Sequence, residues 1–179
     1  MTKKINQRTR ITKRILKDSL IELLKNKTIY QISIRELCDK AEINRSTFYK
    51  YYGSQFDLLE EMEVDLMALV EEALSKSTRV NGHNRSAFQT ICRYLEENLE
   101  LSRLLINNNV DPVFAEKILG SDQVKKEIYK MLGPNYSERE SEYAYNYITY
   151  GAYQVLRVWL NKDKRETPEE IVEIIMKQL

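Results

Sequence analysis

The twenty residues from Ser33 to Tyr52 constrain the fold most, because their pattern predicts two short helices joined by a tight turn. Ser33 and Glu36 have the spacing of a capping box, which starts the first helix. The turn occupies residues 42–44, and the second helix covers residues 45–51. Four apolar residues of the first helix recur with the spacing of one buried stripe, namely Ile34, Leu37, Cys38 and Ala41.

This pair of helices has the form of a helix-turn-helix, whose second helix enters the major groove of DNA. Phe48 and Tyr52 are expected to be buried and to fix the angle between the two helices. Arg45 and Thr47 lie at the N-terminal end of the second helix, where such helices meet base edges. Side chains with the reach to contact phosphates follow them, namely Tyr49, Lys50 and Tyr51.

Charge is divided unevenly along the chain. Residues 1–55 hold 13 Lys and Arg against 5 Asp and Glu, whereas residues 56–179 hold 15 against 22. The near-neutral total of +1 therefore conceals a net charge of +8 at one end and −7 over the rest. A basic segment of this kind points to a polyanionic partner.

The remainder of the chain also predicts helices. Only five Gly and three Pro occur in 179 residues, and no segment alternates apolar and polar residues as a strand would. A first helix is expected over residues 7–26, and Asp111-Pro112 is expected to cap and begin another. The predicted fold is all-α, with about nine helices and a three-helix N-terminal domain.

Two domains follow from this arrangement. Residues 1–53 are predicted to bind DNA, and residues 54–179 are predicted to form a second, all-helical domain. A long helix over residues 54–77 is expected to connect them. The helices over residues 137–160 and 168–179 are expected to pair with their symmetry mates in a dimer.

Several stretches of the N-terminal part resemble the DNA-binding domain of TetR-type transcriptional regulators. The resemblance covers residues 8–62 and suggests the branch with a short, variable C-terminal regulatory domain. It rests on Ile32-Ser-Ile-x-Glu-Leu, Ala41-x-Ile43, Ser46-Thr-Phe-Tyr-x-Tyr-Tyr52 and Ser54-x-x-Asp-Leu-Leu59.

This resemblance implies a role for each matching residue. Arg35 matches a base-contacting position at the start of the second helix of the family. Arg45, Ser46, Thr47 and Tyr49 match its recognition helix, and Lys50 and Tyr51 match contacts to phosphates or bases. The resemblance also implies a ligand-responsive repressor that binds a pseudo-palindromic operator as a homodimer. In such a protein residues 54–179 would be the domain for ligand binding and dimerisation.

Two positions depart from the family pattern. Gln55 stands where the family usually has a phosphate-binding Lys, and Gly53 replaces a frequent Lys or Arg. These departures leave open an alternative function, a co-regulator that docks another protein through its C-terminal domain. They also leave open a weaker affinity for phosphates.

The helix over residues 137–160 carries two candidate functional faces. Tyr143, Tyr147 and Tyr150 share one stripe, which could line a ligand pocket or could simply pack in the core and the interface. A small-molecule effector is therefore a possible partner. The candidate dimer-interface residues are Gly151, Val155, Trp159, Ile171, Ile174 and Ile175.

Composition argues against other classes of protein. Cys38 and Cys92 are the only cysteines and are expected to be core residues, and the single histidine, His83, is expected in a loop. No metal site, cofactor or enzymatic nucleophile is predicted from these residues. No apolar run is long enough to span a membrane, and the N-terminus lacks the pattern of a signal peptide, so a cytoplasmic protein is expected.

Overall fold

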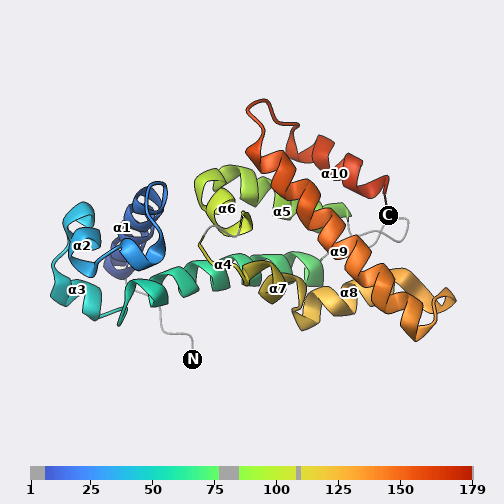
Figure 1. The fold of residues 1–179 in the computed structure, drawn as a ribbon, viewed down its shortest axis with the longest axis horizontal. Helices are drawn as coiled ribbons and strands as arrows, with labels where there is room; N and C mark the ends of the chain where they lie inside the picture. Colours follow the sequence, from blue (N-terminus) through green and yellow to red (C-terminus); the bar gives the residue numbers. More distant parts are fainter. Residues whose placement is uncertain (1–6, 77–84, 108–109, 179) are drawn as a thin grey trace. The chain divides into compact units, whose positions relative to one another are not determined.

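The structure, a computed structural model, describes residues 7–76, 85–107 and 110–178 (Figure 1). Over these residues the chain contains ten α-helices and two short 3₁₀ turns and no strand, which confirms the predicted all-α class. The helices are α1 (Gln7–Leu24), α2 (Ile34–Ala41), α3 (Arg45–Tyr49), α4 (Gln55–Lys76), α5 (Arg85–Glu97), α6 (Leu99–Ile106), α7 (Phe114–Leu119), α8 (Asp122–Leu132), α9 (Glu138–Asn161) and α10 (Pro168–Met176).

The chain divides into two compact units, Met1–Asp65 and Leu66–Leu179, which we call the head and the body. The helix α4 crosses this division as one continuous helix. Within the head, α2 packs against both α1 and α3. The core of the head is formed by apolar side chains that are almost fully buried, including Leu16, Leu20, Leu37, Phe48, Leu58 and Met62.

Polar side chains begin several helices where the sequence predicts. The hydroxyl of Ser33 accepts a hydrogen bond of 3.1 Å from the Glu36 amide at the start of α2. Reciprocal capping boxes begin α9 at Ser137 and α10 at Thr167. Capping satisfies amide groups that have no partner in the first turn of a helix, so these residues fix where each helix begins.

One predicted helix start is corrected by the structure. The helix α7 begins at Phe114 instead of at Pro112, and Val113 is its N-cap. The Asp111 carboxylate accepts a 3.0 Å hydrogen bond from the Val113 amide. This bond closes a turn before the helix, as Asp side chains commonly do.

Within the body, α9 contacts α6, α7, α8 and α10, and α10 lies along α5 (Figure 1). Trp159 of α9 is almost fully buried, and its indole N–H donates a 2.7 Å hydrogen bond to the Glu166 carbonyl. The segment after α9 is therefore held against the same helix that it leaves.

Three further features of the described residues concern membranes, metals and cysteines. None of the described helices is long and apolar enough to cross a bilayer, and the described residues contain no cluster of three or more potential metal ligands. Cys38 and Cys92 are free and buried, as a core role requires, and burial raises the pKa of the Cys92 thiol to about 12. His83 lies outside the described residues.

Candidate functional site

The short helix α3 is held by aromatic residues on its inner side. The Phe48 ring is completely buried, and its centroid lies 5.7 Å from the centroids of both Tyr49 and Tyr52. Asn44 is the N-cap residue, although its side chain makes no capping bond. Its carbonyl accepts instead from the amides of Thr47 and Phe48, at 2.9 and 3.1 Å. These contacts give α3 a fixed orientation in the head.

A left-handed residue shapes the turn before α3. Glu42 has a φ of 54°, a conformation that favours glycine, and it is the C-cap of α2. The next amide, of Ile43, donates a 3.0 Å hydrogen bond to the Cys38 carbonyl. The predicted tight turn is therefore present, with a non-glycine residue at its sterically demanding position.

The predicted DNA-contacting side chains are accessible in the head. Arg45, Ser46, Tyr49 and Lys50 are exposed, whereas Thr47 and Tyr51 are half-buried. Arg35 of α2 is also exposed. Its guanidinium lies 3.6 Å from the Asp39 carboxylate, one turn further along the same helix. An exposed pair at this distance contributes little free energy, so the guanidinium is free to take another partner.

Tyr51 is oriented by its neighbours. Its hydroxyl lies 3.5 Å from the Thr9 hydroxyl of α1, and the Lys50 ammonium lies 5.8 Å from the centroid of its ring.

The start of α4 is capped by the side chain of Asp57. The Gly53 amide donates a 2.8 Å hydrogen bond to Asp57, and the Ser54 hydroxyl donates one of 2.6 Å to the same carboxylate.

A charged cluster joins α1 to α4 within the head, and sequence reasoning missed it. Glu61 pairs with both Lys13 and Lys17, the latter at 2.8 Å, and Lys17 also pairs with Asp65 at 2.6 Å. The Lys13 ammonium lies 5.1 Å from the centroid of the Tyr52 ring. Because the partners are about 48 residues apart in sequence, no local spacing could have revealed the cluster.

The pKa values of this cluster reflect its contacts. Burial opposes the charged form of Glu61, but hydrogen bonds from Lys13 and Lys17 outweigh it and lower the pKa of this carboxyl. Burial likewise opposes the charged form of Lys17, but its bonds to Asp65 and Glu61 raise its pKa. Burial, followed by the nearby Glu61 charge, raises the pKa of Tyr52. All these shifts favour the charge states that hold α1 against α4.

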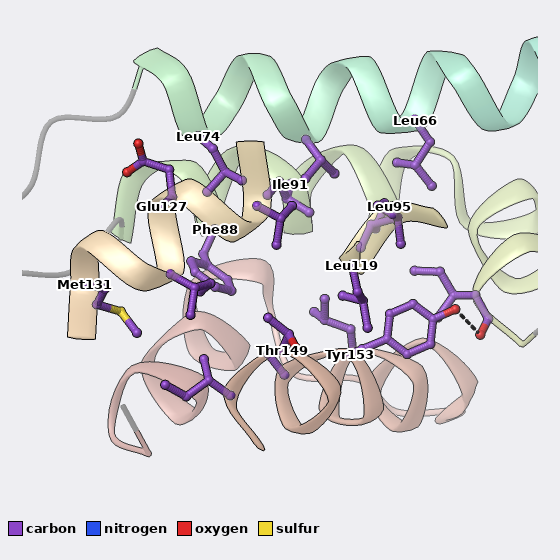
Figure 2. A pocket seen from close by; sticks show the side chains of 18 residues that line it. Leu66, Leu74, Phe88, Ile91, Leu95, Leu119, Glu127, Met131, Thr149 and Tyr153 are labelled. Atoms are coloured by element: carbon purple, nitrogen blue, oxygen red, sulfur yellow. Dashed lines mark hydrogen bonds between the residues drawn. The ribbon is translucent and has the colours of Figure 1, made fainter. Parts of the chain in front are cut away.

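The body contains an apolar cavity of about 110 Å³ (Figure 2). Eighteen side chains from α4 to α9 line it, and only Glu127, Thr149 and Tyr153 among them are polar. On α4, the cavity is lined by Leu66, Val70 and Leu74. A concave, mostly apolar space of this kind is the usual form of a small-molecule site.

The three tyrosines assigned to a pocket lie outside this cavity. Tyr143, Tyr147 and Tyr150 do not line it and are 66%, 79% and 47% exposed. The lining from α9 is instead Ile148, Thr149, Ala152, Tyr153 and Leu156. The prediction that the three tyrosines line the ligand pocket is therefore wrong for this cavity. The face of α9 that points into the cavity is a different one from the face that carries them.

The predicted interface residues separate into two groups. Gly151 and Ile174 are exposed and Val155 is half-buried, so all three are accessible in a single chain. The structure does not support the assignment of the other three, Trp159, Ile171 and Ile175, to the interface. Packing inside the body already buries them in a single chain. We use the term α9 stripe for the exposed face that carries Tyr143, Tyr147, Tyr150, Gln154 and Val158.

Comparisons with known proteins agree with these features. A family model described as "Transcriptional regulator C-terminal region", of the TetR type, matches residues 83–179. The chain is 24% identical over 162 residues to the uncharacterized HTH-type transcriptional regulator YxbF of Bacillus subtilis strain 168. This match covers 87% of the chain but only 41% of the length of that curated relative.

Two solved structures share the fold. A TetR transcriptional regulator from Streptococcus agalactiae 2603V is 20% identical, with a TM-score of 0.67 and coverage of 94% of this chain and 93% of that one. The dihydroxyacetone kinase operon activator DhaS is also 20% identical, with a TM-score of 0.64 and coverage of 94% of both chains. Since the family model spans more than half of the chain, the chain belongs to the TetR family of transcriptional regulators.

Proposed function

We propose that the chain is a ligand-responsive repressor that binds a pseudo-palindromic operator as a homodimer. In this proposal residues 1–53 bind DNA in the cytoplasm, and residues 54–179 bind the ligand and dimerise, with a connecting helix over residues 54–77. The observation that carries the proposal is the exposed polar face of α3, which is held in place by the buried Phe48.

The exposed side chains divide by chemistry into two roles. Arg45 and Arg35 suit guanine, which accepts two hydrogen bonds from a guanidinium, and Ser46 and Thr47 suit several bases. Tyr49, Lys50 and Tyr51 suit phosphates, which position the helix without reading sequence. Gln55 and Gly53 supply no charge at the start of α4, so the basic residues of α1 would carry more of the phosphate contact.

Homodimerisation is supported by the α9 stripe. Three tyrosines and Val158 expose apolar surface on one side of a helix, and Ile174 of α10 exposes more. Large apolar side chains exposed on one side of a helix are consistent with an interaction site. A single recognition helix reads only a few base pairs, so pairing two copies by a two-fold axis would extend the sequence that is read.

Ligand response is supported by the position of α4. Leu66, Val70 and Leu74 of this helix line the body cavity, while Leu58 and Met62 of the same helix are buried in the head. We propose that a ligand in the cavity shifts α4 and changes the separation of the two recognition helices. The ligand would act by favouring one position of α4 over another.

The second candidate function is a co-regulator that docks another protein through the α9 stripe. The same exposed tyrosines favour it, and so does the missing charge at Gln55 and Gly53. It predicts a chain that stays monomeric until its partner is present and that has no specific operator.

The test is selection of a bound sequence from random DNA, followed by binding measurements on variants. Arg45→Ala is expected to lose about tenfold to a hundredfold in operator affinity and to relax preference at one base. Tyr49→Ala is expected to weaken binding to all sequences. Arg139→Ala and Tyr136→Ala, which alter exposed residues of the body, are the matched controls.

Salt dependence gives an independent check on this proposal. Operator affinity of the wild type should fall steeply as salt rises, because binding to phosphates releases counterions. Selection that enriches no sequence, or Arg45→Ala and Tyr49→Ala variants that bind as the wild type does, would exclude operator recognition by α3.

A further inference from the structure

The hydroxyl groups that line the body cavity are already engaged with the protein. The Tyr153 hydroxyl donates a 2.9 Å hydrogen bond to the Ile106 carbonyl, which Figure 2 shows as a dashed line. The Thr149 hydroxyl donates a 2.7 Å bond to the Tyr145 carbonyl. Each hydroxyl has a single proton, so neither can donate to a ligand without losing its present bond.

The one charged residue of the lining is an acid. Glu127 lies 3.7 Å from the Lys130 ammonium, and Figure 2 places its carboxylate at the edge of the lining side chains, away from Tyr153. A carboxylate cannot donate a hydrogen bond and repels an anion. The other lining side chains are apolar, so no side chain of the lining offers a donor or a positive charge to a ligand.

We infer that the effector, or the part of it that enters this cavity, is an uncharged hydrocarbon group about the size of one aromatic ring. Such a group would carry no carboxylate, phosphate or carbonyl into the cavity, because a buried acceptor without a donor is strongly unfavourable. Recognition would rest on shape and on the burial of apolar surface.

The cavity volume sets the size. An engineered protein cavity of about 150 Å³ binds benzene, and the cavity here is about 110 Å³. A single ring therefore requires a small outward adjustment of the lining. Met131 is suited to this adjustment, since its unbranched side chain has three rotatable bonds.

This inference rests on the proposed function in one respect, that the cavity is the effector site. Its test therefore begins without DNA. Toluene and benzoate are titrated into the full chain, and binding is followed by calorimetry and by NMR of the methyl groups. Toluene is expected to saturate, whereas benzoate, with the same ring and a carboxylate, should bind at least a hundredfold more weakly.

A homologous series measures what the cavity recognises. From benzene to toluene, affinity is expected to rise by at most about fourfold, the gain for one fully buried carbon. The gain should stop once the cavity is full, so still larger alkylbenzenes should bind no better.

Variants locate the site. Ala152→Phe fills the cavity and should weaken toluene binding at least tenfold. Lys125→Phe adds the same ring at an exposed position of α8 and should leave toluene binding unchanged. Leu156→Ala enlarges the cavity and should shift the preference toward naphthalene, which gives a second test if Ala152→Phe does not fold.

The outcomes of this test and of the operator test are distinguishable. Toluene binding that Ala152→Phe removes supports the inference even if no operator is found, in which case only the proposed function fails. Benzoate that binds as tightly as toluene, or toluene binding unaffected by both cavity variants, overturns the inference and leaves operator binding untouched.

Discussion

Replacing Tyr147 with serine is expected to weaken self-association of the chain by about a thousandfold. Tyr147 is 79% exposed in a single chain and is the most exposed tyrosine of the α9 stripe. A tyrosine side chain offers roughly 200 Å² of surface, so about 160 Å² of it is available for burial in a dimer. At about 25 cal/mol per Å², complete burial would contribute about 4 kcal/mol per chain.

Partial burial at an interface reduces this figure to about 2 kcal/mol per chain. A two-fold dimer contains the residue twice, so the expected loss is about 4 kcal/mol, or roughly three powers of ten in the dissociation constant. The isolated chain should keep its stability to within about 0.5 kcal/mol, because the side chain is on the surface.

The assay is sedimentation equilibrium over a concentration series, with thermal unfolding measured on the same samples. Tyr30→Ser is the matched control, since Tyr30 is 82% exposed but belongs to the head. A wild-type chain that is monomeric at about 10 μM, or a Tyr147→Ser variant that dimerises as the wild type does, would refute the reasoning.

Three further changes have expected outcomes. Glu42→Gly should raise the free energy of unfolding by about 0.5–1 kcal/mol in urea titrations, because it relieves the left-handed backbone at φ 54°, whereas Glu42→Ala should give no gain. The pKa of Glu61 is lower in the folded chain than its ordinary value of 4.5. Its ion pairs therefore stabilise the head fully at pH values above 4.5, and this stabilisation is lost as the pH falls through the pKa of the folded state. Glu61→Gln should therefore flatten the decline of Tm between pH 5 and 3 seen by circular dichroism, and an equally steep decline would contradict this. Gly151→Ala should favour the helix by about 1 kcal/mol in the monomer, since a Cβ there meets no atom within 4 Å, but should raise the dimer dissociation constant in sedimentation.

The helices of the head could be predicted from sequence because their signals are local. A capping residue at Ser33 and buried residues at helical spacing fix where α2 begins and which side faces inward. The helix-turn-helix and its exposed side chains follow from those two facts. The cluster around Glu61 could not be predicted, since it depends on how α1 packs against α4.

The orientation of α9 marks the limit of sequence reasoning in the body. This helix is apolar on more than one side, so periodicity alone offers several stripes that could face the core. The structure buries Tyr145, Thr149 and Tyr153, and all three hydroxyls donate hydrogen bonds to carbonyls, of α7, of α9 itself and of α6 respectively. Such contacts depend on how α9 packs against segments distant in the sequence, and they fix which face of this helix points to the core. A pattern of residue types in one helix does not predict them.

The continuity of α4 bears on how much binding energy the proposed ligand response would require. This helix of 22 residues contains no Gly or Pro. In the proposed mechanism, a shift at Leu74 would therefore reach Glu61 along a regular helix. A tenfold loss of operator affinity needs a ligand to prefer one position of α4 by about 1.4 kcal/mol. At about 25 cal/mol per Å², roughly 56 Å² of extra apolar contact in that position is sufficient. One aromatic ring against Leu66, Val70 and Leu74 can supply this area, so a small hydrocarbon is energetically adequate as an effector without any polar contact.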